Sequence, residues 1–135
     1  MKTSLTAGVS TTRRFVVDRG RTIDFMGEEG RVYATPELVR DIEITCREFL
    51  LEHLDTGEDT VGTRVEIDHL AATLMDMPVE ITVTVAEVKG RGVTLAVEGR
   101  DPIDVIVKGS HSRFVVDVAK TKERLLGKAA KFKQG

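Results

Sequence analysis

The chain is poor in cysteine and aromatic residues: its 135 residues include one cysteine, no tryptophan and one tyrosine. One cysteine cannot form an intrachain disulfide, which favours a reducing compartment. Segment 1–8 lacks the apolar core of a signal peptide, and no apolar run approaches the roughly 20 residues of a membrane span. A formal charge of −2 gives no global signature of nucleic-acid binding. We therefore expect a soluble, cytoplasmic protein without a nucleic-acid or membrane partner.

The length fits one domain, residues 1–135, with a single core. No cysteine and histidine spacing suggests a zinc site, and we expect neither a metal nor a cofactor. Cys46 falls on an apolar stripe, where a free thiol behaves as a small hydrophobic group.

Segment 33–43 predicts the start of one long buried helix. Thr35 is expected to accept a hydrogen bond from the first-turn amides, Pro36 suits the first helical position, and Glu37 complements the helix dipole. Glu43 lies at the flank of an apolar stripe with helical spacing, which consists of Leu38, Val39, Ile42, Cys46, Phe49, Leu50 and Leu54.

After a turn at 55–59, the apolar period changes to two. The first strand, 61–71, is expected to bury Val61, Thr63, Val65, Ile67, His69 and Ala71. Strands at 79–89, 93–98 and 103–116 follow as an antiparallel meander. A short strand is expected at 14–17, a surface loop at 18–32 and a basic, weakly amphipathic helix at 117–135.

One helix followed by long antiparallel strands predicts an α+β domain, in which a curled sheet wraps around the helix. The chain resembles a hot-dog fold thioesterase, specifically the fluoroacetyl-CoA thioesterase-like group, from about residue 32 to 116. The resemblance rests on an ordered set of residues: Ala34-Thr35, Glu43, Gly62-Thr63, His69 and Gly109-Ser110-His111-Ser112-Arg113.

The resemblance implies that Thr35, Glu43 and His69 hydrolyse an acyl-CoA thioester to a free acid and CoA, which is part of the substrate. Glu43 would be the nucleophile or the base that activates water, His69 the proton carrier and Thr35 their hydrogen-bonding partner. The Gly62 amide would hold the acyl group. Arg113 would orient the site or bind the anionic end of CoA.

Each of these residues also has a simpler interpretation. Thr35 alone is typical of a helix cap, and a lone inward His69 is more often a hydrogen-bonded core residue. Glu43 could pair with Arg40 or Arg47 on the helix surface. Gly62 could simply bend the strand.

His111 and Arg113 share one face of their strand, so they could line the same cavity or stack at a sheet edge. Two other functions also stay open: a non-catalytic acyl-CoA-binding module, and a hot-dog dehydratase or hydratase.

Within the resembled family, fluoroacetyl specificity is associated with an aromatic-bearing lid before the helix. Here segment 24–30 is short, acidic and rich in glycine, so we expect a different small or medium acyl group. A single curled sheet leaves an open edge, and hot-dog proteins pair two protomers, so a homodimer is expected.

Overall fold

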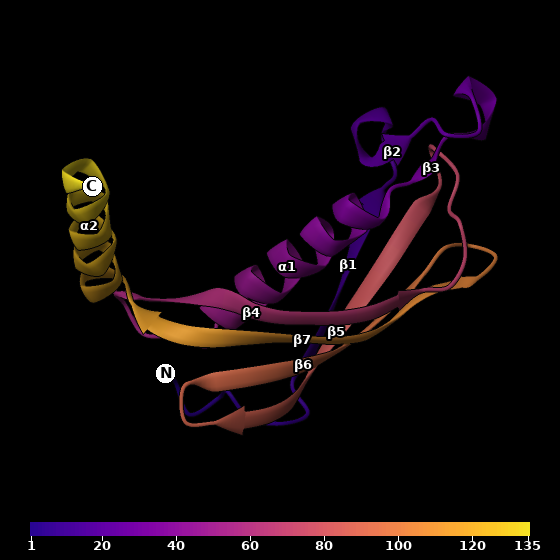
Figure 1. Ribbon diagram of the computed structural model, residues 1–135. Coiled ribbons are helices and arrows are strands. Elements are labelled where there is room, and N and C mark those ends of the chain that lie inside the picture. Colours follow the sequence, from indigo (N-terminus) through magenta and orange to yellow (C-terminus); the bar gives the residue numbers. More distant parts are fainter.

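A computed structural model describes all 135 residues. One antiparallel sheet curls around helix α1 (Thr35–Leu51), as Figure 1 shows. Its strand order is β1-β5-β6-β7-β4. The strands are β1 (Ser10–Val16), β4 (Glu58–His69), β5 (Pro78–Lys89), β6 (Gly92–Arg100) and β7 (Val105–Asp117). The predicted α+β architecture, with its long helix and its meander, is confirmed.

The core lies between α1 and the concave face of the sheet. The predicted apolar stripe of α1 supplies Leu38, Ile42 and Leu50, which are fully buried. Alternate residues of the meander face them and are also buried: Val79, Ile81, Val83, Val85, Val93, Leu95, Val97, Val107 and Val115. Ile106, next to Val107 at the start of β7, is buried as well. The two periodicities therefore meet in one apolar layer, which fixes the position of α1 on the sheet.

The predicted burial of β4 is wrong for half of its residues. Val61, Thr63 and Val65 are exposed, whereas Ile67, His69 and Ala71 are half-buried. Val61 pairs with Phe114, and both side chains are exposed. Gly62 and Val65 both line a cavity beside α1, although they are three residues apart. The register of β4 against β7 shifts between Gly62 and Arg64, which marks a β-bulge. The extra residue reverses the alternation, so Val61 points away from the helix while Val65 points toward it.

Residues 18–33, called the lid segment below, contain more secondary structure than the predicted loop. They form η1 (Arg19–Arg21), β2 (Thr22–Ile23), η2 (Glu28–Gly30) and β3 (Val32–Tyr33), and β2 pairs with β3. Buried Asp41 on α1 accepts a hydrogen bond from Arg21 Nε at 2.8 Å and another from the Tyr33 hydroxyl. These bonds fasten the base of the lid segment to the helix.

The chain ends in helix α2 (Val118–Gln134), which stands away from the sheet at the end of β7 (Figure 1). No residue of α2 is buried. Neither α1 nor α2 has the length and apolar character that a membrane-crossing helix requires.

Candidate active site

Thr35 and His69 come together at the start of α1 and the end of β4. The Thr35 hydroxyl and His69 Nδ1 are 2.8 Å apart. The expected capping role of Thr35 is wrong: Ala34 occupies the N-cap position, and no side chain caps α1. Thr35 is the first residue of the helix, so its hydroxyl is free to bind the imidazole.

His69 keeps one nitrogen unbound. Nε2 is the only buried side-chain nitrogen or oxygen atom that has no hydrogen-bond partner. Burial lowers the pKa of His69 below its ordinary value, so the imidazole is neutral at pH 7. A neutral imidazole with a free nitrogen can accept or pass on a proton.

Glu43 lies farther along α1, beside a cavity of about 270 Å³. Its carboxylate makes no hydrogen bond, and its side chain is 45% exposed. The alternative pairing with Arg47 does not form, because Arg47 binds Asp59 at 2.7 Å. The guanidinium of Arg113 is the nearest cation, 4.0 Å from Glu43 Oε2. The carboxylate is therefore available to a ligand in the cavity.

Gly62 allows this carboxylate to approach the backbone of β4. A Cβ atom at position 62 would lie 3.4 Å from Glu43 Oε2, 3.4 Å from Arg113 Nη1 and 3.3 Å from His111 Cε1. Contacts of 3.3–3.4 Å are tight, so a side chain here would crowd all three groups. The position suits glycine because the backbone lies close to polar side chains.

Arg113 and His111 line the buried wall behind Glu43. Arg113 Nε donates to the Thr60 hydroxyl at 2.7 Å, and Nη2 donates to the Thr60 carbonyl at 2.8 Å. His111 Nε2 is 3.1 Å from Arg113 Nη1, and its Nδ1 is 2.8 Å from the Arg64 carbonyl. Thus His111 and Arg113 do share an interior face.

The tautomer of His111 follows from these two contacts. A guanidinium can only donate, so His111 Nε2 must accept, and Nδ1–H must donate to the Arg64 carbonyl. Burial, with Arg113 nearby, lowers the pKa of His111, whereas the Arg64 carbonyl and Glu43 oppose that shift. A neutral His111 therefore links Arg113 to the bulged backbone of β4.

The structure separates the predicted catalytic residues into two groups. Thr35 and Glu43 are eight residues apart on α1, about 12 Å along the helix axis. Gly62 and His69 are seven residues apart on β4, about 23 Å along the strand. The helix runs antiparallel to β4, so Thr35 meets His69 and Glu43 meets Gly62. Glu43 and His69 therefore do not converge within one chain.

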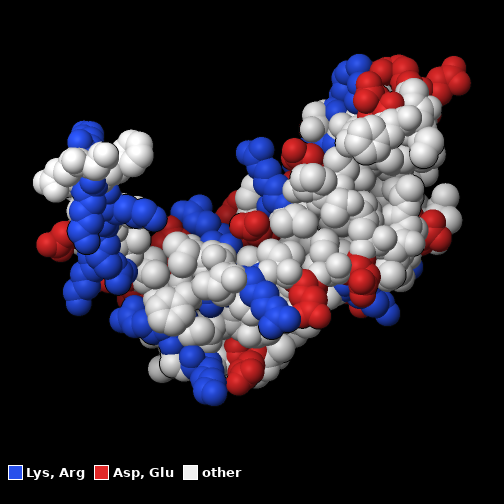
Figure 2. Space-filling model, viewed as in Figure 1, with Lys and Arg blue, Asp and Glu red and all other residues white.

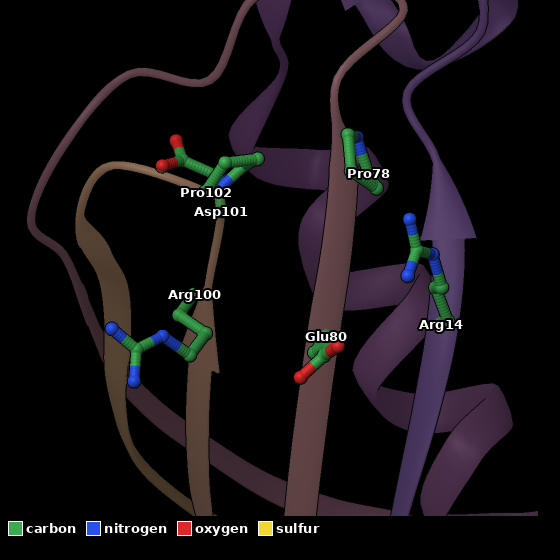
Figure 3. Close-up of a pocket in the computed structure, with 6 residues that line it drawn as sticks. All are labelled: Arg14, Pro78, Glu80, Arg100, Asp101 and Pro102. Carbon is green, nitrogen blue, oxygen red and sulfur yellow. The ribbon is translucent and has the colours of Figure 1, made fainter.

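A larger cavity of about 350 Å³ lies on the opposite, convex face of the sheet. It is lined by Arg14, Pro78, Glu80, Arg100, Asp101 and Pro102 (Figure 3). The Arg100 guanidinium is directed away from Glu80. Asp101 is occupied by hydrogen bonds from Thr73 and from the Ile103 and Asp104 amides. This cavity presents no nucleophile or general base aimed at a common point.

Cys46 is fully buried on α1, and burial raises the pKa of its thiol to about 12. The predicted role as a small core hydrophobic group is consistent with this position. The role of Asp41 was not predicted, because a single aspartate on a helix gives no sign that a distant arginine will bind it.

Comparison with known proteins yields consistent matches. The model of the fluoroacetyl-CoA-specific thioesterase family matches residues 8–119. The fluoroacetyl-CoA thioesterase of Streptantibioticus cattleyicolor is 30% identical over 127 residues, which cover 89% of this chain and 91% of that protein.

Solved structures agree. A fluoroacetyl-CoA thioesterase structure has a TM-score of 0.83 at 28% identity, covering 92% of this chain and 97% of its own. A Thermus thermophilus hypothetical protein, a thioesterase superfamily member, has a TM-score of 0.88 at 26% identity, and the match covers 97% of this chain and 98% of that chain. A hot-dog-like protein from Thermanaerovibrio acidaminovorans has a TM-score of 0.83 at 26% identity, covering 90% and 91%.

Proposed function

Because this chain belongs to the fluoroacetyl-CoA-specific thioesterase family, we propose that it hydrolyses the thioester bond of a small or medium acyl-CoA. We also propose that it acts in the cytoplasm. The hot-dog fold of its structural relatives is present throughout the domain. The observation that carries the proposal is the Glu43 carboxylate, which makes no hydrogen bond, lies 4.0 Å from the buried Arg113 guanidinium and faces a cavity beside the Gly62 backbone.

Hydrolysis needs a base or nucleophile, a proton carrier and donors for the developing oxyanion. In our proposal Glu43 takes a proton from water as it attacks the thioester carbonyl, or attacks the carbonyl itself to form an anhydride that water then hydrolyses. In both cases the C–S bond breaks and CoA leaves as a thiolate. His69 gives this thiolate the proton of its Nε2 and regains a proton from the attacking water, while Thr35 holds the imidazole by its Nδ1. The Gly62 amide holds the acyl group. Arg113 orients Glu43 or binds the anionic end of CoA.

We further propose that the site is completed in a homodimer. Strand β4 is an edge strand of the sheet and is free to pair with its own copy. In a two-fold antiparallel pairing, the end of one β4 lies beside the start of the other. His69 and Thr35 of one protomer would then approach Glu43 and Gly62 of its partner. The free His69 Nε2 supports this arrangement, since it lacks a partner within its own chain.

The acyl group need not be fluoroacetyl. The tip of the lid segment, residues 24–30, carries Phe25 and Met26, but their side chains are 82% and 81% exposed rather than turned into the site. We therefore expect another short or medium acyl chain.

Release of free CoA thiol from a panel of acyl-CoA thioesters tests the activity. We expect turnover of at least one short or medium acyl-CoA. Binding of an acyl-CoA without cleavage would contradict hydrolysis and favour the non-catalytic binding module.

Subunit complementation tests the shared site. Glu43→Ala and His69→Ala chains should each be inactive alone. In a composite site, a mixed dimer of the two retains one intact site. Random mixing should then restore roughly a quarter of wild-type activity, because half of the dimers are mixed and each has one working site of two. No recovery in dimers proven to be mixed would place the whole site within one chain.

A further inference from the structure

Helix α2 is an amphipathic helix with no partner in the protomer. Val118, Leu125 and Phe132 recur every seven residues and form one line along it, and the Phe132 side chain is 85% exposed. A helix of 17 residues gains little stability in water unless it packs its apolar face. The family model ends at residue 119, so membership in the family assigns α2 no role.

The charge of α2 is opposite to that of the rest of the chain. It holds six Lys or Arg residues and one Glu, a net charge of +5. Because the whole chain has a formal charge of −2, the remainder carries −7. Figure 2 shows basic side chains gathered on α2 at one end of the molecule, and acidic side chains with basic ones beside them at the lid segment at the other. An acidic surface is thus the complement of α2.

The tip of the lid segment, residues 24–30, matches α2 in both respects. It holds three acidic residues and no basic one. Glu28 is paired with Arg19 and Arg31, and Asp24 lies 3.9 Å from Arg31, so Glu29 is the acidic side chain that the protomer leaves without an ion pair. It also exposes Phe25 and Met26 to solvent. Two exposed apolar surfaces with opposite charges can bury each other with little electrostatic cost.

The topology brings these two surfaces together across the proposed two-fold axis. Helix α2 leaves the sheet where Asp117 pairs with Glu58, the first residue of β4. The lid segment lies at the other end of β4, where Thr35 contacts His69. Both α2 and the lid segment rise on the α1 side of the sheet (Figure 1). Antiparallel β4 pairing therefore places α2 of one protomer over the lid segment of its partner.

We propose that α2 of each protomer packs on the tip of the partner's lid segment and thereby helps to close the mouth of the shared active site. The proposal rests on the homodimer inferred above. It gives α2 a substrate-retaining role: closure holds the acyl-CoA in place, while the chemistry belongs to the residues of the site.

Intermolecular cross-linking in the full chain tests the contact directly. The doubly substituted chain Met26→Cys/Phe132→Cys should form a covalent dimer on mild oxidation, because position 132 lies on the apolar line of α2. The matched chain Met26→Cys/Lys131→Cys, with its cysteine turned about 100° around the helix, should form far less. Buried Cys46 does not compete for oxidation.

A kinetic test uses Leu125→Gln/Phe132→Gln, with Lys120→Gln/Lys131→Gln as the control on a flank of α2, about 100–120° around the helix from the apolar line. The first pair should raise KM several-fold and leave kcat nearly unchanged, whereas the control should change KM less. Circular dichroism confirms that α2 stays helical in both variants.

The possible outcomes distinguish failure of the α2 contact from failure of the homodimer on which it rests. A monomer by light scattering would overturn both the dimer and the α2 contact. An active dimer without cross-link and without a change in KM would overturn the α2 contact alone. Binding of α2 to vesicles of anionic phospholipid, abolished by Leu125→Gln/Phe132→Gln in a chain that does not cross-link, would assign the apolar line to a membrane surface instead.

Discussion

The two halves of the candidate site differ in charge and in how their side chains are held. At the start of α1, Thr35 and His69 form a neutral hydrogen-bonded pair, and one imidazole nitrogen has no partner. Near the middle of α1, the Glu43 carboxylate is half-exposed and makes no hydrogen bond, and it lies 4.0 Å from the buried Arg113 guanidinium. The first half can carry a proton but has no carboxylate, and the second has a carboxylate but no proton carrier. Each half therefore lacks what the other contains.

The largest effect should come from removing the functional group that defines each half. Glu43→Gln or His69→Ala should each lower kcat by about a hundredfold or more, as expected for loss of a nucleophile or general acid–base group. Steady-state hydrolysis of the best acyl-CoA measures this. Unchanged thermal unfolding would show that the fold is intact, and retention of more than a tenth of the activity by either variant would remove that residue from the chemistry.

A smaller loss of activity is expected when Thr35 no longer positions His69 but the imidazole itself is kept. Thr35→Val keeps the shape of the side chain but loses the bond to His69 Nδ1, and it should reduce kcat by roughly tenfold, since about 1.4 kcal/mol of lost stabilisation has that effect. Thr35→Ser keeps the hydroxyl and should retain most of the activity. Equal activity of the two variants would mean that the Thr35–His69 bond has no catalytic role.

Two substitutions of His111 should resolve how the charged half is held. Asn can replace Nδ1 as donor to the Arg64 carbonyl but cannot reach Arg113, whereas Gln can reach Arg113 but not the carbonyl. We expect His111→Asn to reduce kcat several-fold, because Arg113 loses a partner near Glu43. His111→Gln should mainly lower the melting temperature, because the bulge of β4 loses a hydrogen bond. The reverse pattern would mean that the bulge, not Arg113, controls the activity.

The smallest expected effect is the dependence of stability on pH, which involves one histidine from each half of the site. His69 and His111 both have a pKa lowered by burial, so below about pH 6.5 the unfolded chain binds more protons than the folded one. Stability should therefore be constant above pH 6.5 and decline as pH falls through the lowered values. We expect Tm to drop by a few degrees between pH 7 and 5.5.

Glu28, whose pKa is lowered to about 2 by Arg19 and Arg31, keeps its charge throughout that range. His111→Gln should reduce the drop. A Tm that rises as the solution is acidified would contradict burial of the neutral imidazoles.

The fold was largely predictable because its strongest patterns are local. The helical stripe of α1 and the alternation of β5, β6 and β7 each follow from side chains that face one core. The burial of β4 was predicted incorrectly around Val61, because an alternating pattern holds only while each residue of β4 pairs with one residue of β7. At the bulge near Thr63, two residues of β4 lie opposite one residue of β7, and no local residue pattern predicts this bulge.

Family resemblance identified the candidate residues of the site, but it did not predict their geometry. The ordered set of Thr35, Glu43, Gly62, His69 and Arg113 was recognised through family resemblance, and single-residue interpretations of Thr35 and Glu43 would have missed it. Their distances depend on the crossing of α1 over β4, a tertiary property that sequence spacing does not contain. Sequence spacing likewise does not predict whether a catalytic set is formed within one chain or between two chains.

The position of Cys46 has a practical consequence. Its thiol is sealed in the core with a pKa of about 12, so almost no thiolate exists at working pH and reagents have no access. A chromogenic disulfide reagent added to the native enzyme should therefore give a flat baseline. Every equivalent of colour developed in its presence then counts one turnover, and a sudden single equivalent per chain reports that the protein itself has unfolded.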